Sequence, residues 1–157
     1  MVALFQRSFR HYENFKVMPS NDKLNENDYD VQIPLGSIGR FFIKNKIDIS
    51  SRVKPFLKSD SNQTKIIKRN LKKENKIICG LSWKTKNQET GFNRSINLDT
   101  LMPILQLNNF IFVNLQYGDS NKELKKLAKN YNIKNYNSID NFNDLDGFVN
   151  LIDACDV

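Results

Sequence analysis

Cysteine and histidine are scarce in this chain of 157 residues, which has two cysteines, Cys79 and Cys155, and one histidine, His11. Without closely spaced cysteines or more histidines, both a disulfide framework and a structural zinc site are disfavoured, and we expect no metal or cofactor. Each cysteine stands in an apolar stretch, so we expect buried, reduced thiols. Long apolar runs are also lacking, because none approaches the roughly 20 residues that a membrane-spanning helix needs.

The first residues lack the features of a secretory signal. Arg7 brings charge into the segment early, and no apolar stretch is followed by a small-residue cleavage site. We therefore expect a cytoplasmic protein without a membrane span. Hydrophobic residues make up 39% of the chain and charged residues 26%, which is typical of a globular protein of about one domain's size.

The net charge of +7 suggests a nucleic-acid partner at first. However, all 24 basic residues precede Tyr136, and the residues after it carry only aspartates as charged groups. The 22 asparagines, 18 lysines and 15 isoleucines reflect a bias that an AT-rich genome produces at tolerant surface positions. The basic run from Lys65 to Lys73 has the apolar stripe of a packed helix, without interleaved aromatic residues, so nucleic-acid binding is disfavoured.

The first third of the chain predicts short elements. Val2–Phe9 has the spacing of an amphipathic helix, and Phe15–Met18 is a strand candidate. Tyr29–Leu35 alternates apolar and polar residues, which predicts a second strand, and Gly36–Arg40 supplies a turn before a short helix. We place a domain boundary in the irregular segment that follows, giving domains 1–57 and 58–157.

The second domain alternates helices and strands, and its first strand is apolar on both faces, as in a parallel strand covered by helices. This order predicts an α/β fold with a parallel, Rossmann-like sheet and flanking helices. Asp156 and Val157 stand where a further strand would begin. The predicted elements are a helix over 63–73 with Ile66, Ile67 and Leu71 buried, a strand over 77–83, a helix over 98–105 capped by Asn97 with Leu98, Leu101, Met102 and Leu105 on one face, a strand over 110–116, a helix from Ser120 to Asn132, a short strand over 133–136 and a helix over 144–152.

Several segments, in this order, carry a resemblance to a known family: Leu4–Phe9, Asp30–Ser37, Gly80–Lys84, Asn93–Leu98 with Leu101–Leu105, Phe112–Gly118 and Asp140–Asp156. They resemble bacterial GT-B glycosyltransferases of the tetratricopeptide-repeat-linked type, akin to heptosyltransferases and O-linked N-acetylglucosamine transferase. The resemblance implies an incomplete GT-B fold. Residues 1–57 would be the end of its N-terminal domain, and residues 58–157 the first half of its C-terminal, nucleotide-sugar-binding domain. The family's repeats, and the phosphate-binding loop that follows the position of Val157, have no counterpart in this sequence.

Candidate binding residues lie where parallel strands end, because such a sheet places its ligand outside the carboxyl ends of its strands. The diphosphate of a nucleotide sugar needs cations, and Lys84 and Arg94 follow the first strand of the second domain. Arg94 is the stronger candidate. The alternative for Arg94 is a surface arginine that pairs with Asp99 or caps a neighbouring helix, and the alternative for Lys84 is a solvated loop residue.

The remaining candidates each have a structural alternative as well. Ser95 could donate to a phosphate or cap the following turn, and Gln116 could bind the donor or satisfy backbone groups. Gly118 could admit close approach of a ligand or serve a plain turn. Trp83 could form an aromatic wall of the cleft or belong to the core. Gly36 and Ser37 are expected near the interdomain cleft or in an ordinary strand-to-helix turn.

No residue can be assigned as the general base of an inverting transfer, and we expect His11 at the surface. The resemblance implies transfer of a hexosyl or heptosyl group from a nucleotide sugar to an unidentified protein or glycan, by a chain that is catalytically incomplete on its own. The first alternative is a non-catalytic α/β binding or structural module, and the second is a basic nucleic-acid-binding protein.

Overall fold

The computed structural model describes residues 1–45, 55–72, 75–85, 87, 89, 91–118, 120–127 and 131–157. Their contacts define two compact units. The larger unit comprises residues 59–157 with Met1 and Ala3, and the smaller one comprises residues 4–58 with Val2. The division between Lys58 and Ser59 lies next to the boundary expected from the sequence, and the assignment of the two parts to GT-B domains stays a prediction.

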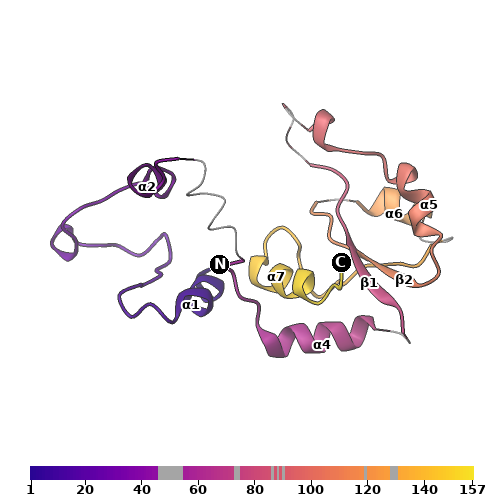
Figure 1. Ribbon diagram of the computed structural model, residues 1–157, viewed down its shortest axis with the longest axis horizontal. Coiled ribbons are helices and arrows are strands. Elements are labelled where there is room, and N and C mark those ends of the chain that lie inside the picture. Colours follow the sequence, from indigo (N-terminus) through magenta and orange to yellow (C-terminus); the bar gives the residue numbers. More distant parts are fainter. Residues whose placement is uncertain are drawn as a thin grey trace. The chain divides into compact units, whose positions relative to one another are not determined.

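A parallel three-stranded sheet forms the centre of the larger unit (Figure 1). Its strands are β1 (Ile77–Leu81), β2 (Phe110–Asn114) and β3 (Ile133–Lys134), in the order β1-β2-β3. Cys79 is in register with Phe112, and Phe112 with Ile133. The predicted α/β fold with a parallel sheet is therefore confirmed.

Helices connect the strands, and polar side chains fix where several of them begin. Asp60 accepts hydrogen bonds from the backbone N–H groups of the first turn of α4, Asp144 caps α7, and Asn97 caps η3 as predicted. Pro103 stands in the first turn of α5, where its missing N–H is tolerated. The helices are α4 (Ser61–Leu71), the 3-10 helices η2 (Phe92–Arg94) and η3 (Leu98–Leu101), α5 (Met102–Leu105), α6 (Asn121–Leu127) and α7 (Leu145–Asp153).

Two hydrophobic clusters cover the two faces of the sheet, because side chains of a strand alternate between its faces. Ile78 and Val113 face α4 and α7, while Phe112 faces the side of η3, α5 and α6. The first cluster contains Ile67, Leu71, Ile78, Val113, Leu151 and Ala154, and the second contains Trp83, Leu98, Leu105, Phe112 and Leu124.

The predicted burial was wrong at two helical positions. Ile66 is 47% exposed, because the buried stripe of α4 passes through Thr64, Ile67 and Leu71 instead. Met102 is exposed as well, because the backbone changes there from η3 to α5. A single helical period that is continued from η3 into α5 therefore assigns Met102 to the wrong face.

The last two residues pair with the edge of β1 that faces away from β2. The N–H groups of Asp156 and Val157 donate to the carbonyl of Ile78 at 2.7 and 3.2 Å, and the N–H of Gly80 donates to the carbonyl of Val157 at 2.8 Å. A residue that bonds both neighbours of Cys79 in this way is in parallel pairing with it. Asp156 and Val157 thus lie along the edge where a further strand was expected, but neither residue is itself in a strand.

The smaller unit contains α1 (Val2–Phe9), the 3-10 helix η1 (Glu26–Asp28) and α2 (Leu35–Phe42). The predicted helix over Val2–Phe9 is confirmed. The strands predicted at Phe15–Met18 and Tyr29–Leu35 were wrong, since no residue of either segment is in a strand. The predicted turn Gly36–Arg40 was also wrong, because these residues belong to α2, which begins directly after Pro34.

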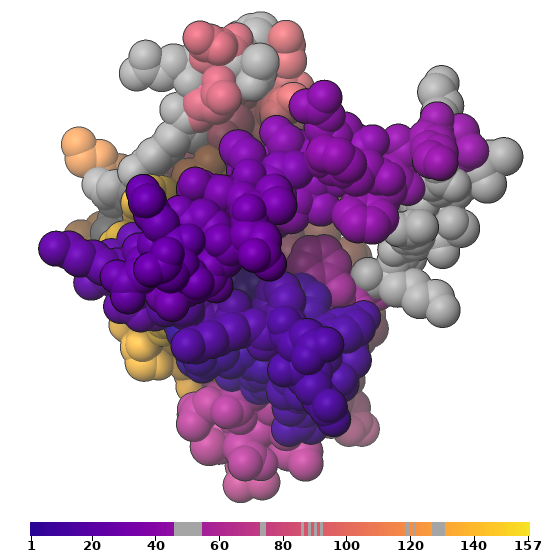
Figure 2. Space-filling model, turned by 90° about the vertical axis from the view of Figure 1, so that its left-hand side faces the viewer, coloured from indigo at the N-terminus to yellow at the C-terminus, as the bar shows by residue number. Residues whose placement is uncertain are grey.

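Many apolar side chains of the smaller unit, which is coloured indigo to purple in Figure 2, are exposed. Within this unit, Phe9 contacts the rings of Phe5, Phe15 and Phe56, with centroids 5.9, 4.8 and 6.1 Å away. His11 is exposed, as expected. The exposed apolar residues include Val31, Leu35, Phe41, Phe42 and Phe56.

Candidate functional site

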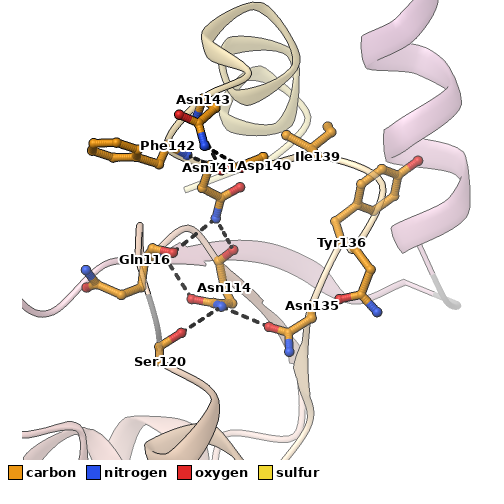
Figure 3. A pocket seen from close by; sticks show the side chains of 12 residues that line it. Asn114, Gln116, Ser120, Asn135, Tyr136, Ile139, Asp140, Asn141, Phe142 and Asn143 are labelled. Carbon is orange, nitrogen blue, oxygen red and sulfur yellow. Dashed lines mark hydrogen bonds between the residues drawn. The ribbon is translucent and has the colours of Figure 1, made fainter.

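A polar pocket of about 460 Å³ opens at the carboxyl edge of the sheet, where β2 and β3 end side by side (Figure 3). The loop between β3 and α7 supplies most of its other residues. Its lining is rich in amide side chains and consists of Asn114, Gln116, Gly118, Ser120, Asn135, Tyr136, Asn137, Ile139, Asp140, Asn141, Phe142 and Asn143.

Hydrogen bonds between these amides hold the walls of the pocket together. Asn114 donates through Nδ2 to Asn135 Oδ1 at 2.9 Å and to Ser120 Oγ at 3.4 Å. Asn141 donates through Nδ2 to the backbone carbonyls of Asn114 and Gln116, at 3.1 and 3.3 Å. The ends of β2 and β3 and the following loop are therefore joined by side chains that also face the pocket (Figure 3).

The side-chain oxygen of Asn141 lacks a hydrogen bond of this kind. Its Oδ1 is buried and finds no hydrogen-bond partner among the residues that the structure describes. The two carbonyls that Nδ2 meets fix the orientation of the amide, since a flipped amide would set oxygen against oxygen. A buried acceptor without a partner costs about 1–3 kcal/mol, which this loop bears in the folded protein.

Asp140 supplies the only formal charge among the described residues of this pocket. Its carboxylate accepts hydrogen bonds from Asn143 Nδ2 at 2.8 Å and from the backbone N–H groups of Phe142 and Asn143 at 2.9 and 3.1 Å. These bonds, led by that from the Asn143 side chain, lower the pKa of Asp140. The pocket therefore offers amides, hydroxyls and one carboxylate, which suit a neutral ligand rich in hydroxyl or N–H groups.

Gln116 joins the ends of β1 and β2. Its Oε1 accepts from the backbone N–H groups of Trp83 and Lys84 at 3.1 and 3.0 Å and from Ser82 Oγ at 3.4 Å. Its Nε2 donates to the carbonyls of Lys84 and Tyr117 at 2.8 and 3.0 Å. With 3% of its surface exposed, this side chain satisfies backbone groups, which is the structural alternative foreseen for it.

Trp83 and Lys84 both contact Glu123 on α6. The indole Nε1 of Trp83 donates to Glu123 Oε2 at 2.7 Å, and Lys84 Nζ forms an ion pair with Glu123 Oε1. Trp83 is buried in the second hydrophobic cluster, as its structural alternative predicts. Lys84 and Glu123 line a second pocket of about 340 Å³, together with Asn97, Asp99, Lys126 and two apolar residues, Ile96 and Leu98.

The other predicted residues are spread over the fold. Arg94 is exposed at the end of η2, and Asp99 pairs with Lys126 at 2.9 Å instead of with Arg94. Ser95 Oγ accepts from the backbone N–H of Thr85 at 3.1 Å. Gly118 lines the polar pocket with a φ of 79°, a conformation that favours glycine.

The structure thus brings two predicted residues, Gln116 and Gly118, to the polar pocket and places Lys84 in the second one. Gly36 and Ser37 lie in the first turn of α2, in the smaller unit, and a Cβ at Gly36 would meet open space. Sequence reasoning missed the asparagines and Asp140 of the pocket. A signal for two of them existed, because Asn114 ends one strand and Asn135 follows its neighbour.

These features define an α/β protein with a parallel sheet and an amide-lined pocket at the carboxyl edge of that sheet. No family model, curated protein or solved structure matches the chain. Within the described residues, no helix is long and apolar enough to cross a membrane, and no group of three or more metal-binding side chains comes together.

Proposed function

We propose that this chain provides the donor-binding part of a GT-B-type glycosyltransferase, which transfers a hexosyl or heptosyl group from a nucleotide sugar to a protein or glycan. The proposal rests on the order of the segments that resemble this family. The observation that carries it is the amide-lined pocket at the carboxyl edge of a parallel sheet, the edge at which such sheets bind ligands.

The chemistry of the pocket suits the uncharged part of a nucleotide sugar. Amide side chains donate and accept at once, as do the hydroxyls of a sugar and the edge of a base. The Asp140 carboxylate already accepts three hydrogen bonds within its own loop and can accept one more from a sugar hydroxyl. A volume of about 460 Å³ is within the usual range for small-molecule sites.

The charged part of the donor requires cations, and the loop after β1 contains two candidates. Arg94 is exposed and can form two parallel hydrogen bonds to a phosphate, whereas Lys84 would act as a point charge. Gln116 lines the pocket and bonds both backbone groups of Lys84, which ties this loop to the pocket wall.

Calorimetric titration tests the proposal. The diphosphates of uridine, guanosine, adenosine and thymidine are titrated against the parent chain, Arg94→Ala and Arg69→Ala, the last removing an exposed arginine of α4. We expect one nucleotide to bind, about tenfold more weakly to Arg94→Ala, because a charge-assisted hydrogen bond is lost, and unchanged to Arg69→Ala. Absence of binding for all four nucleotides at millimolar concentration would contradict the proposal.

A non-catalytic binding module is the second candidate, favoured by one observation. The amide of Gln116 and the ammonium of Lys84 are both engaged by groups of the protein itself. A module of this kind would bind a free sugar or nucleoside as tightly as the diphosphate, because the phosphates would make no contact. The same calorimetric panel, extended to nucleosides, separates the two functions.

A further inference from the structure

Glu123 connects the two loops at the carboxyl edge of the sheet. It lies in the first turn of α6, after β2, and its carboxylate meets Trp83 and Lys84, which follow β1. One oxygen accepts the indole N–H of Trp83 at 2.7 Å, and the other pairs with the ammonium of Lys84. The cation that the proposed function assigns to a phosphate is thus held by a carboxylate of the protein.

We propose that Glu123 sets the affinity with which a phosphate group binds at Lys84, because a phosphate can reach the ammonium of Lys84 only in competition with the Glu123 carboxylate. The inference rests on the proposed function in one respect, namely that Lys84 meets the diphosphate of the donor. It adds a residue that controls this contact and names the ligand class as a phosphate monoester or diphosphate.

The exposure of the pair permits such competition. The side chains of Lys84 and Glu123 are 31% and 41% exposed, so an anion in solution can approach the ammonium. Partly exposed ion pairs contribute little to stability, since water and salt screen them. A diphosphate carries more negative charge than a carboxylate and can therefore displace it.

The second pocket provides an internal comparison for this argument. It is lined by two lysines and two carboxylates, which pair as Lys84 with Glu123 and Lys126 with Asp99. Neutralising either carboxylate changes the charge of the pocket by the same amount. Only the loss of the Glu123 charge releases Lys84.

Trp83 reports on the displacement directly. It is the sole tryptophan of the chain, 3% of its surface is exposed, and its indole N–H is bound to Glu123. A phosphate that draws Lys84 away from Glu123 changes the environment of the indole ring. The emission of Trp83 should therefore shift during the titration.

The test uses inorganic pyrophosphate, followed by Trp83 fluorescence and calorimetry. It compares the parent chain with Glu123→Gln and with the matched control Asp99→Asn, at fixed ionic strength. Because two unit charges a few ångströms apart in water interact with about 1 kcal/mol, or roughly a factor of five in affinity, and pyrophosphate is multiply charged, we expect about tenfold tighter binding to Glu123→Gln. Asp99→Asn should gain about threefold or less, and Lys84→Met in the Glu123→Gln background should abolish the gain.

Glutamine retains an oxygen that can accept the indole N–H of Trp83, so Glu123→Gln should fold, which circular dichroism verifies. Equal gains in Glu123→Gln and Asp99→Asn would overturn the inference, because pocket charge alone would explain them. Absence of pyrophosphate binding to Glu123→Gln would overturn it as well. If nucleoside diphosphates nevertheless bind the parent chain, this inference alone fails; if pyrophosphate behaves as expected and no nucleotide binds, the proposed function alone fails.

Discussion

Replacing Gln116 by leucine should destabilise the larger unit strongly. Leucine is similar in size to glutamine, so packing changes little, but every hydrogen bond of the amide is lost. The backbone N–H groups of Trp83 and Lys84 and the carbonyls of Lys84 and Tyr117 would then lose their side-chain partner. The carboxyl ends of β1 and β2 would no longer be joined by this side chain.

The magnitude follows from the burial of these groups. A buried donor or acceptor without a partner costs about 1–3 kcal/mol. Trp83 is buried, so its backbone N–H cannot form a hydrogen bond with water instead. Lys84 and Tyr117 are half-buried, so water can replace part of the hydrogen bonding that their backbone groups lose. We therefore expect Gln116→Leu to lower the free energy of unfolding by about 3 kcal/mol, a large share of the roughly 5–15 kcal/mol typical of native proteins.

Urea denaturation measures this loss, followed by far-ultraviolet circular dichroism and by the emission of Trp83. The control is Gln106→Leu, which changes an exposed glutamine at the end of α5 and should shift the free energy of unfolding by no more than about 0.5 kcal/mol. A loss below about 1 kcal/mol for Gln116→Leu would refute the reasoning, because water would then satisfy the backbone groups that the Gln116 amide bonds in the parent chain.

Three further predictions concern the packing around β1. The pKa of Asp156 is lowered by the hydrogen bond from the N–H of Ile78, at 3.0 Å, and by Lys68, at 2.6 Å. The ionised carboxylate therefore stabilises the fold above about pH 4. This contribution is lost as the pH falls through the lowered pKa of the folded state. Asp156→Asn should accordingly be less stable than the parent chain at pH 7, by less than about 1 kcal/mol in urea unfolding, and equally stable near pH 2; a difference independent of pH would contradict this. Gly80→Ala should cost about 1–3 kcal/mol and lower the melting temperature, because the new Cβ would collide with the side chain of Leu115 and lie 3.3 Å from the sulfur of Cys155; an unchanged melting temperature would show that β1 can shift. Burial raises the pKa of the Cys155 thiol to about 11, so its reaction with a disulfide reagent at pH 8 should be much slower in the folded than in the urea-unfolded protein, and equal rates would exclude a buried thiol.

Periodicity was sufficient to predict the larger unit. Both main strands and α4, α6 and α7 begin within about two residues of their expected positions, because these segments bury their apolar side chains within one sheet and its helices. The sequence also located the start of α6, which was expected at Ser120 and is observed at Asn121. It did not reveal that Glu123 reaches Trp83 and Lys84, since those contacts depend on how the loops meet in space.

The smaller unit shows where periodicity fails. Tyr29–Leu35 alternates as a strand would, yet Tyr29, Val31 and Ile33 are all exposed and no strand forms. A strand needs a partner that accepts its backbone hydrogen bonds, and alternation within one segment does not provide it. The helix that follows begins at Leu35, because Pro34 is compatible with the position just before a helix.

The pocket was missed for a compositional reason. With 22 asparagines in the chain, single asparagines carry little information, and the bias of the whole sequence explained them adequately. Only the pairing of β2 with β3 places Asn114 beside Asn135, and only the loop after β3 brings Asn141 to the same place. Two of the candidates that the sequence did supply, Gln116 and Lys84, are engaged by groups of the protein itself.

The pairing of Val157 with β1 affects how the protein should be handled in the laboratory. The N–H of Gly80 donates a hydrogen bond to the carbonyl of Val157. Because backbone groups alternate along β1, the carbonyl of Gly80 and the N–H of Ser82 point to the same edge. Residues appended after Val157 would therefore lie along that edge. A purification tag or fluorescent fusion attached there would begin next to the open edge of β1, where its linker can form hydrogen bonds with that strand. Such an edge is also a template on which other chains can add. A tag placed before Met1 leaves that edge unaltered, and expression trials that compare the two placements would show this as a difference in soluble yield.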